Sequence, residues 1–363
     1  MTFNSAFWHG RRVLLTGHTG FKGSWLLLWL QQLGANVSAY ALEPENEPNL
    51  CRQLAALRPS GECWQQQFGD LADLKALRAF VQRSQPEVVL HLAAQPLVRL
   101  SYQEPVATWE TNVMGTIHVL EALRLLDQPC SAVLITTDKV YRNQEWVYGY
   151  RENDPLGGHD PYSSSKAAAE IAIASWRSSF CGTLPHQTPH IRVASARAGN
   201  VIGGGDWALD RIVPDAIRAL SKGEPIRVRN PGATRPWQHV LEPLGGYLCL
   251  AERLSDSADR TSAFNFGPHL EANRPVRELV EEALKYWPGS WQDQSDPKAP
   301  HEASLLNLVI DRAHHELGWA PRWNFASTVE RTINWYRRVQ LGEASALECC
   351  QDDLTSYLTS IPT

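Results

Sequence analysis

Short apolar runs alternate with stretches of helical periodicity in the chain up to residue 198. The apolar runs occupy residues 12–16, 36–42, 87–93, 131–137 and 191–197, and one more strand is expected just before Asp70. The helical stretches lie near residues 21–33, 71–84, 105–126 and 161–180. Strands that are apolar on both faces and separated by helices are typical of a parallel sheet covered on both sides. The order therefore predicts an α/β fold with a Rossmann-like, doubly wound parallel sheet.

The sequence changes character beyond Gly199, where it runs through the glycine-rich and polar connections GNVIGGGDW, NPGATRPW and PHLEANRP. With 363 residues, the chain is long enough for a large α/β core and a smaller lobe. We expect a first domain at residues 1–198, to which the chain returns at about 236–267. A smaller C-terminal lobe is expected at 199–235 and 268–363.

Charge and composition exclude several classes of protein. A formal net charge of -5 and a pI of about 6.2 give no basic field for a nucleic acid or an anionic membrane. The longest apolar stretch, residues 25–30, is far shorter than the roughly 20 residues that span a bilayer, and the N-terminus lacks the apolar segment of a signal peptide. The seven cysteines form no CxxC pair, and their odd number argues against a disulfide framework. We expect a cytoplasmic protein with reduced thiols and no metal site.

The segment TGHTGFKG places Gly17, Gly20 and Gly23 at three-residue spacing between a strand and a helix. In this context Gly17 permits a tight turn, Gly20 lets the backbone approach a pyrophosphate, and Gly23 lets the helix pack closely on the sheet. Asp70 is suited to a hydrogen bond with an adenine amino group, and the small residues of HLAAQ, 91–95, leave room for a ribose. Together these features predict a dinucleotide site.

One residue expected in such a site is absent. An acid at the end of the second strand normally binds the hydroxyls of the adenosine ribose. Here Ala41 stands at that place, and Glu43 follows two residues later. No nearby arginine invites a 2'-phosphate. We therefore predict NAD rather than NADP, bound less tightly than is usual.

The segment HDPYSSSK contains Tyr162 and Lys166, which are four residues apart and therefore neighbours on one helix face. Asp160 is suited to cap this helix and Pro161 to begin it, which places Tyr162 in the first turn. The helix dipole and Lys166 are both expected to lower the pKa of Tyr162 from about 10. Tyr162 is then a general base that can take a hydroxyl proton while NAD accepts a hydride. Lys166 is also placed to bind the nicotinamide ribose.

Nine segments together resemble the extended short-chain dehydrogenase/reductase family, over nearly the whole chain. They are GHTGFKG, GDLAD, HLAAQ, ETNVMGT, TTDKVY, YSSSK, RAGNVIGGGDW, RPWQHV and ELGWAPRW. Within this family the chain looks most like the sugar-nucleotide 4,6-dehydratases, and TTDKVY with RAGNVIGGGDWALDRIVPD is most similar to those that act on CDP-glucose. The cofactor-binding residues that the resemblance implies are Gly17, Gly20, Phe21, Lys22, Gly23, Asp70, Leu71, Leu92, Ala93, Ala94, Thr136, Tyr162 and Lys166.

The segment TTDKVY puts an acid beside a base where a buried strand ends. The loss of water across C5 and C6 of a 4-keto sugar requires a base at C5 and an acid at the C6 hydroxyl. The resemblance implies that Thr137 hydrogen-bonds the C4 oxygen, that Asp138 protonates the departing hydroxyl, and that Lys139 takes the C5 proton where the family usually has glutamate. Because adjacent strand residues face opposite sides, the chain must leave strand geometry at about Asp138 for both groups to reach one sugar.

The base role of Lys139 raises a difficulty. A lysine with the ordinary pKa of about 10.4 is protonated at neutral pH, so burial or a neighbouring cation must lower the pKa of Lys139. Equally, the pKa of Asp138 must be raised for its carboxyl group to carry a proton. An ion pair between the two would shift both values the wrong way. The alternative keeps Lys139 protonated, so that it stabilises the enolate.

The resemblance implies a lyase that converts CDP-D-glucose to CDP-4-keto-6-deoxy-D-glucose, for deoxysugars of bacterial surface polysaccharide. Asn200 would contact the phosphate of the nucleotide sugar, and a guanidinium fork at Arg235 suits its diphosphate. The substrate-binding candidates are Gln95, Asn200, Arg211 and Arg235. Among the fourteen tryptophans, Trp207 or Trp237 could stack on the substrate, although buried packing is the commoner role.

Two other functions share parts of this pattern. A nucleotide-sugar 4-epimerase shares the fold, NAD, Tyr162 and Lys166, but does not need Asp138 with Lys139. A noncatalytic NAD-binding protein of the same fold would not need the tyrosine and lysine pair. The resemblance also suggests a homodimer or a dimer of dimers, built through helices near 105–126 and 161–180. The choice of CDP over other nucleotides rests on the resemblance alone.

Overall fold

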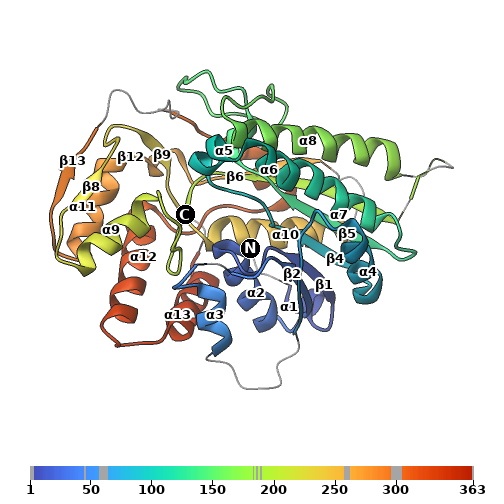
Figure 1. Ribbon diagram of the computed structural model, residues 1–363, viewed down its shortest axis with the longest axis horizontal. Helices are drawn as coiled ribbons and strands as arrows, with labels where there is room; N and C mark the ends of the chain where they lie inside the picture. Colours follow the sequence, from blue (N-terminus) through green and yellow to red (C-terminus); the bar gives the residue numbers. More distant parts are fainter. Residues whose placement is uncertain are drawn as a thin grey trace.

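A computed structural model describes residues 4–44, 46–56, 64–182, 184, 187–188, 190–256, 262–295 and 305–361. Its centre is a parallel sheet of seven strands in the order β11-β6-β5-β4-β1-β2-β3 (Figure 1). The strands are β1 Arg12–Thr16, β2 Asn36–Ala41, β3 Trp64–Phe68, β4 Val88–His91, β5 Cys130–Ile135, β6 Ile191–Ala198 and β11 Ala263–Phe266. The predicted doubly wound α/β fold is confirmed.

Helices cover both faces of the sheet, because successive strand residues point to opposite sides. Leu14 of β1 packs with α4, α7 and α8, whereas Val13 and Leu15 pack with α2 and α10. The helices of the first half are α1 Ser5–Trp8, α2 Phe21–Gln32, α3 Leu50–Ala56, α4 Leu74–Ser84, α5 Val98–Gln103, α6 Pro105–Trp109, the π-helical turn η1 Glu110–Met114, α7 Gly115–Leu123 and α8 Pro161–Phe180. The helix predicted at 105–126 thus consists of α6, the π-helical turn η1 and α7, which follow one another without a break.

The second half of the chain builds a smaller group of elements beside the sheet (Figure 1). The helices of the second half are α9 Ile212–Ser221, α10 Leu241–Asp256, α11 Val276–Tyr286, η4 Leu270–Ala272, η5 Ala313–Leu317, α12 Phe325–Gln340 and α13 Ala346–Thr359. Of these, α10 packs on the sheet itself. The short strands of the second half pair as β7 Val201–Ile202 with β10 Gln238–His239, β8 Ile226–Val228 with β13 Trp291–Asp293, and β9 Thr234–Pro236 with β12 Asn273–Pro275. Between these elements the chain returns to the sheet as β11, parallel to β6.

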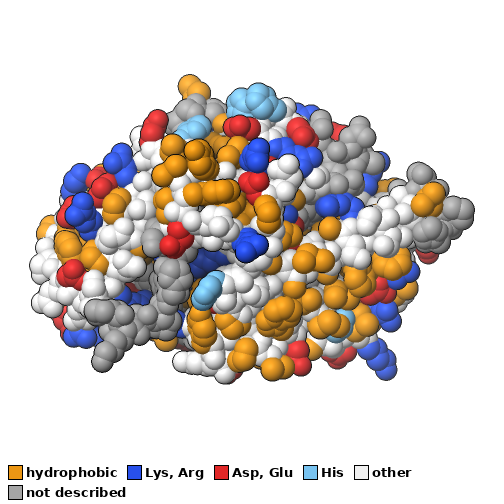
Figure 2. Space-filling model, turned by 90° about the horizontal axis from the view of Figure 1, so that it is seen from above, with side chains coloured by type: hydrophobic (Ala, Val, Ile, Leu, Met, Phe, Trp, Pro, Cys, Tyr) orange, Lys and Arg blue, Asp and Glu red, His pale blue; other side chains and the backbone are white. Residues whose placement is uncertain are grey.

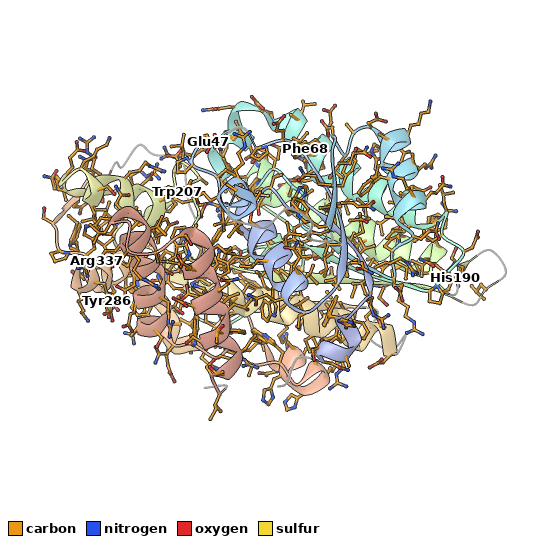
Figure 3. All side chains as sticks on the ribbon, turned by 90° about the horizontal axis from the view of Figure 1, so that it is seen from below. Glu47, Phe68, His190, Trp207, Tyr286 and Arg337 are labelled. Carbon is orange, nitrogen blue, oxygen red and sulfur yellow. The ribbon has the colours of Figure 1, made fainter. Side chains whose placement is uncertain are left out.

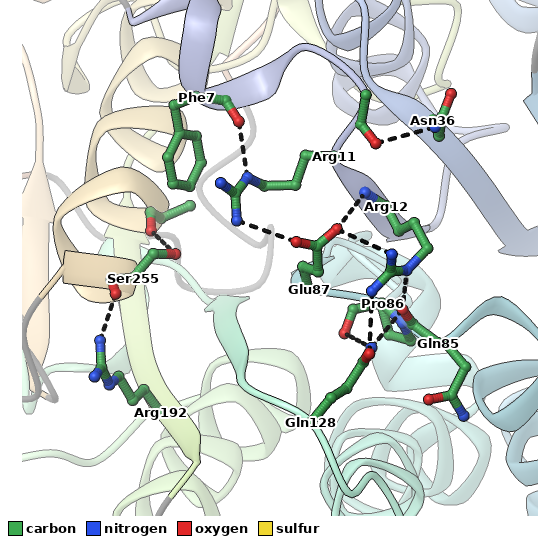
Figure 4. Close-up of polar contacts among 12 residues, drawn as sticks. Phe7, Arg11, Arg12, Asn36, Gln85, Pro86, Glu87, Gln128, Arg192 and Ser255 are labelled. Atoms are coloured by element: carbon green, nitrogen blue, oxygen red, sulfur yellow. Dashed lines mark hydrogen bonds and ion pairs between the residues drawn. The ribbon is translucent and has the colours of Figure 1, made fainter.

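Charged residues tie the strands together at their amino ends (Figure 4). The Glu87 carboxylate accepts a hydrogen bond from the Arg12 backbone amide at 3.1 Å, and it pairs with the side chains of Arg11 and Arg12. The Arg12 guanidinium also donates to the Gln85 carbonyl and to Gln128. The side chains at the amino ends of the strands are therefore engaged in structural contacts. We expect the functional site at the carboxyl ends.

Many of the tryptophans are buried in the core, as is common for this residue. Trp8, Trp25, Trp29, Trp319 and Trp335 are among the largest fully buried side chains. The six cysteines in the described ranges are all free thiols, as expected, and Cys63 lies outside those ranges. Within the described ranges, no helix is long and apolar enough to cross a membrane.

Candidate active site

The glycine turn joins β1 to α2 at the carboxyl edge of the sheet. Gly17 has a φ of +78°, and a β-carbon there would lie 2.6 Å from the backbone nitrogen of Ala93. A β-carbon on Gly23 would lie 2.0 Å from the carbonyl oxygen of Gly17. At Gly20 it would meet only that oxygen, at an ordinary 3.5 Å. Packing within the protein therefore explains Gly17 and Gly23, whereas Gly20 leaves open space at the N-terminus of α2.

The end of β4 is fixed against the glycine turn by a chain of polar contacts. The Thr16 hydroxyl lies 2.7 Å from Nδ1 of His91, and it accepts a hydrogen bond from the Ala93 amide at 3.2 Å. The other nitrogen of His91 lies 3.3 Å from the Thr116 hydroxyl. Burial lowers the pKa of His91 to about 3, and the charge of Lys166 acts in the same direction. His91 is therefore neutral and holds the segment from Leu92 onward in place.

The residues expected around an adenosine lie together at the ends of β2 and β3. Asp70 is exposed, and its carboxylate accepts a hydrogen bond from the Ala72 amide at 2.9 Å. It does not cap α4, because Asp73 does so. Leu71 is buried and packs against Gly115, so only its backbone is available to a ligand.

The expectation that no arginine lies near the end of β2 is wrong. Arg52 of α3 reaches back to this loop and lies 3.6 Å from Glu43, and it also pairs with Glu47. The sequence spacing missed it because Arg52 lies in the first turn of the helix that follows the loop, eleven positions after Ala41. Its guanidinium is occupied by two carboxylates and by the Pro44 carbonyl.

The chain leaves strand geometry where the acid and base require it. β5 ends at Ile135, and Asp138–Val140 forms a single 3-10 turn that Thr137 caps. The Thr137 hydroxyl donates to the Asp138 carboxylate at 2.9 Å. Lys139 is half-buried, and its Nζ lies 6.0 Å from the centre of the Tyr162 ring. Asp138, Lys139 and Tyr162 therefore share one small region.

Asp138 is 3% exposed, and burial raises the pKa of its carboxyl group. Lys139, the Thr137 hydroxyl, Arg235 and Lys22 act in the opposite direction without overcoming the burial. This is the direction that an acid needs in order to carry a proton. Asp138 thus has the electrostatics expected of a proton donor, even though several cations lie near it.

Tyr162 lies where the helix signals place it. α8 begins at Pro161 and is capped by Asp160, whose carboxylate accepts a hydrogen bond from the Ser163 amide at 2.9 Å. The expected fall in the pKa of Tyr162 is wrong for this structure, since burial raises it to about 12. The hydrogen bond with Thr137 and the charge of Arg211 lower the value only in part, and Asp138 raises it further.

Lys166 follows Tyr162 by one helical turn and is 5% exposed. Its Nζ donates to the carbonyl oxygen of Ile135 at 3.3 Å, at the end of β5. Burial lowers the pKa of Lys166 to about 8, and Glu170 on the next turn opposes that change. Lys166 can therefore change its protonation near neutral pH.

Lys22 reaches the same region from the first turn of α2. Its Nζ donates to the Tyr247 hydroxyl at 3.3 Å. Burial lowers the pKa of Lys22 to about 8, with further lowering by Arg211 and Lys166 and an opposing effect of Asp138. Tyr247 of α10 is completely buried, and no pattern in the sequence indicates that it approaches the site. Seen from above, the molecule has a hollow between its two sides in which basic side chains lie (Figure 2).

Two of the four expected substrate residues contribute charge to this region. Arg211 pairs with the buried Asp206 at 2.8 Å and affects the pKa of Tyr162. Arg235 in β9 donates to the Thr234 carbonyl and affects the pKa of Asp138.

The other two expected substrate residues lie in loops after β6 and β4. Asn200 is half-buried and directly follows the β6–Gly199 segment. The Gln95 amide group is engaged within the chain, because it donates to the Leu97 carbonyl and the Thr108 hydroxyl.

Trp207 and Trp237 both have packing partners. Trp207 meets the ring of Tyr336 edge-on at 5.2 Å, beside α12 (Figure 3). Trp237 is 3% exposed, and its indole nitrogen donates to the Arg274 carbonyl at 2.9 Å. Packing therefore describes the two residues better than an open stacking surface.

Three functional neighbours were not found from the sequence. Gly199 makes room for the Asp138 carboxylate, Glu170 accepts a hydrogen bond from Thr136, and Tyr247 contacts Lys22. The glycine in RAGNV was the only available signal among them, since it directly precedes a predicted substrate residue. In the part of the chain that the structure describes, no cluster of three or more histidine, cysteine or acidic residues could hold a metal.

A family model described as GDP-mannose 4,6 dehydratase matches residues 14–332. CDP-glucose 4,6-dehydratase of Salmonella typhimurium is 44% identical to this chain over 98% of both proteins. dTDP-glucose 4,6-dehydratase of Haemophilus influenzae is 25% identical over 89% of this chain and 97% of the relative.

Solved structures share the fold. A dTDP-glucose 4,6-dehydratase of Streptomyces venezuelae, solved with NAD bound, superposes with a TM-score of 0.76 at 23% identity, over 93% of this chain and 99% of that one. A UDP-glucose-4-epimerase of Stenotrophomonas maltophila gives 0.78 at 20% identity, over 92% and 99%. On the family model and the identity to the Salmonella typhimurium protein, the chain belongs to the sugar-nucleotide 4,6-dehydratases of the extended short-chain dehydrogenase/reductase family.

Proposed function

We propose that the protein is a hydro-lyase that converts CDP-D-glucose to CDP-4-keto-6-deoxy-D-glucose, with NAD as a recycled cofactor. The name of the relative at 44% identity supports CDP-glucose as the substrate. One observation carries the reaction type: the buried Asp138, its partner Thr137 and the amine of Lys139 lie together beside Tyr162 at the end of β5. An acid and an amine together at this place suit the loss of water.

The residues present fit a dinucleotide. Gly20 leaves open backbone at the N-terminus of α2, where peptide N–H groups favour a pyrophosphate. The exposed Asp70 and the loop after Ala41 would hold the adenosine, and Lys166 would hold the nicotinamide ribose. When bound, NAD supplies the acceptor for a hydride from C4 of the sugar and later returns that hydride to C6.

In the first step Tyr162 takes the proton of the C4 hydroxyl, while the hydride leaves C4 and a ketone forms. The pKa of about 12 means that the phenol is protonated in the protein alone. The phenol must therefore first release its own proton to solvent, with help from the charges of Lys166 and Arg211 and from the positive charge that a bound nicotinamide would bring. The Thr137 hydroxyl interacts with both Tyr162 and Asp138, and it would turn from the Asp138 carboxylate to donate to the oxygen at C4.

In the second step the 4-ketone makes the C5 proton acidic. Lys139 takes that proton, and Asp138 gives its own proton to the C6 hydroxyl, which leaves as water with its bonding electrons. A double bond forms between C5 and C6. The hydride then adds to C6 and a proton returns to C5, so the net change is the loss of one water. In the alternative, Lys139 stays protonated and stabilises the enolate.

At the substrate end, we assign the diphosphate to Arg235 and Arg211, with Asn200 contacting a phosphate. The Asp206 carboxylate holds Arg211 at 2.8 Å, so its guanidinium is fixed before the substrate arrives. Gln95 remains a candidate for the sugar, although its amide donors already bind Leu97 and Thr108. The cofactor then lies over residues 1–198, and the nucleotide sugar over 199–235 and 268–363, the two regions that we propose as domains.

We also propose a homodimer, or a dimer of dimers, through the helices at 105–126 and 161–180. Large hydrophobic side chains are exposed there, with Val106 at 69%, Trp109 at 42% and Ile171 at 60% exposure. Hydrophobic side chains also gather on the face viewed in Figure 2. A cytoplasmic role in making deoxysugars for O-antigen and lipopolysaccharide completes the proposal, since sugar nucleotides are made for such polymers.

The test is to incubate the purified protein with NAD and, separately, with CDP-, dTDP-, UDP- and GDP-glucose, and to follow the product mass. The loss of one water confined to CDP-glucose is the expected result. Interconversion of epimers without loss of water would instead identify a 4-epimerase, which shares Tyr162 and Lys166. No turnover of any sugar nucleotide, with NAD still bound, would favour a noncatalytic protein.

A further inference from the structure

A buried ion pair lies directly behind the turn that carries Asp138 and Lys139. Glu170 of α8 and Arg197 of β6 are joined at 2.8 Å, and their side chains are 3% and 4% exposed. Burial alone would raise the pKa of Glu170, but Arg197 and two hydroxyl donors lower it below its ordinary value. Both groups are therefore charged. Neither residue is among the groups that we assign to substrate, cofactor or proton transfer.

Each end of the turn is bonded to one member of this pair. Thr136, two residues before Asp138, donates its hydroxyl to Oε1 of Glu170 at 2.5 Å. Tyr141, two residues after Lys139, accepts a hydrogen bond from Nη1 of Arg197 at 2.8 Å. The pair is thus hydrogen-bonded to the residues on both sides of the turn.

The pair is itself fixed from several sides. Ser195 of β6 donates its hydroxyl to Oε2 of Glu170 at 2.8 Å, and Arg197 also donates to the Glu152 carbonyl at 2.9 Å. The Tyr141 hydroxyl donates to Asn265 of β11 at 2.7 Å. Hydrogen bonds to buried charged groups are stronger than those between neutral groups, so these contacts hold their members rigidly.

We propose that the Glu170–Arg197 pair positions the turn Asp138–Val140 for the elimination step, acting through Thr136 and Tyr141. This inference rests on the proposed function, because the elimination step is part of it. The step is sensitive to placement: the carboxyl of Asp138 and the amine of Lys139 must reach C6 and C5 of one sugar at the same time. Tyr162 and Lys166, which serve the oxidation, are carried by helix α8, although Tyr162 also shares a hydrogen bond with Thr137 at the start of the turn.

The pair cannot be tested by removing either charge, because an unpaired buried charge is strongly destabilising and threatens the fold. The two contacts to the turn can be removed while the pair stays intact. Thr136→Val deletes the hydroxyl that reaches Glu170, and Tyr141→Phe deletes the hydroxyl that reaches Arg197. Each change keeps the volume of the side chain nearly constant.

The chain offers a matched control for each variant. Ser195→Ala removes another buried hydroxyl from the same Glu170 carboxylate, but it does so from β6 and not from the turn. Tyr150→Phe removes a buried tyrosine hydroxyl that contacts Asn143 and Gln144, from a ring stacked on Tyr141. Controls and variants therefore lose the same type of group, although the Tyr150 hydroxyl is less deeply buried than that of Tyr141.

The experiment measures oxidation and elimination separately in a single turnover of CDP-glucose with NAD. Reduced nicotinamide absorbance reports the oxidation at C4, and solvent deuterium incorporation at C5 with loss of water reports the elimination. We expect Thr136→Val and Tyr141→Phe to slow elimination by roughly ten- to a hundredfold, the effect of a misplacement on the order of 1 Å. Reduced nicotinamide should accumulate in Tyr141→Phe. Because Thr136 is also an expected cofactor-binding residue, Thr136→Val is measured at saturating NAD, and its elimination should fall relative to its oxidation. Both controls should follow the unchanged protein.

Equal slowing of oxidation and elimination would show a general loss of structure and overturn the proposal. So would controls that behave like the variants, or variants that eliminate water at the normal rate. If one variant does not fold, as judged by thermal unfolding, the other still decides. An unchanged protein that oxidises CDP-glucose but never releases water would instead refute the proposed function, which is a distinct outcome.

Discussion

The carboxyl group of Asp138 occupies the space that a side chain at position 199 would need. A β-carbon built on Gly199 would lie 2.7 Å from Oδ2 of Asp138, closer than real β-carbons come to other atoms. It would also lie 3.2 Å from the ring of Pro236. Gly199 comes directly after β6, and Asp138 comes just after β5. The absence of a side chain at the end of one strand therefore leaves room for the proposed acid at the end of its neighbour.

Gly199→Ala should therefore displace the Asp138 carboxyl group and slow the loss of water. We expect a fall of roughly ten- to a hundredfold in elimination, with oxidation at C4 largely kept. Gly232→Ala is the control, because a β-carbon there has nothing within 4 Å. Product mass and single-turnover absorbance are the measurements. Normal release of water by Gly199→Ala would contradict the role given to the Asp138 position.

Lys139→Met and Asp138→Asn should separate the two halves of the elimination. Lys139→Met is expected to oxidise C4 but not to exchange the C5 proton with solvent. Asp138→Asn is expected to exchange that proton but to release water slowly, because the C6 hydroxyl lacks its acid. Deuterium incorporation, measured by mass spectrometry, distinguishes them. Normal exchange by Lys139→Met would remove the base role and leave the protonated lysine as an enolate-stabilising group.

The adenosine end should favour NAD over NADP. Arg52 lies beside the loop after β2, and it already pairs with Glu43 and Glu47. Changing both acids to glutamine should free the guanidinium and strengthen NADP binding several-fold, a small effect because exposed ion pairs are worth roughly 0–1 kcal/mol. Titration of each nucleotide by calorimetry measures it, with Arg52→Ala added to the double variant as the control. A clear preference of the unchanged protein for NADP would contradict the reading of Ala41.

Lys166 should make stability depend on pH in the alkaline range. Burial lowers the pKa of Lys166 from 10.5 unfolded to about 8 folded, so between these values the unfolded state binds more protons. Stability from this group therefore rises with pH across that window, with a slope of up to about 1.4 kcal/mol per pH unit. Below the window both states are protonated, and the cost of burying the charge is present in full.

The measurement compares urea unfolding of the unchanged protein and of Lys166→Met at several pH values between 8 and 10.5. The difference between their free energies of unfolding should change in favour of the unchanged protein as the pH rises. Lys75→Met, which alters an exposed lysine of α4, should run parallel to the unchanged protein. Parallel curves for Lys166→Met would mean that its amine is not shifted by burial.

The sequence predicted the elements near the site well, because local signals define them. Asp160 and Pro161 fix the start of α8, and the glycine spacing fixes the turn after β1. The sequence could not show which side chains approach from distant parts of the chain. Tyr247 and Arg52 reach the site from α10 and α3, and no periodicity encodes that approach.

The pKa of Tyr162 could not be predicted from the sequence for a similar reason. A cation one turn away and a helix dipole argued for a lower value, and both are local features. The depth of burial depends on the whole fold, and it raises the pKa to about 12. Desolvation outweighs the local charges here, and the direction could be known only once the surroundings of the ring were known.

The edge position of β11 has a consequence for how the molecule is made. β11 pairs with β6 although some sixty-five residues separate them, from Ala198 to Ala263. During synthesis on the ribosome, the edge of β6 that pairs with β11 therefore stays unpaired until that long segment has emerged. Unpaired edges attract other chains. Truncations or slow translation between these strands should therefore yield aggregates rather than a smaller folded unit.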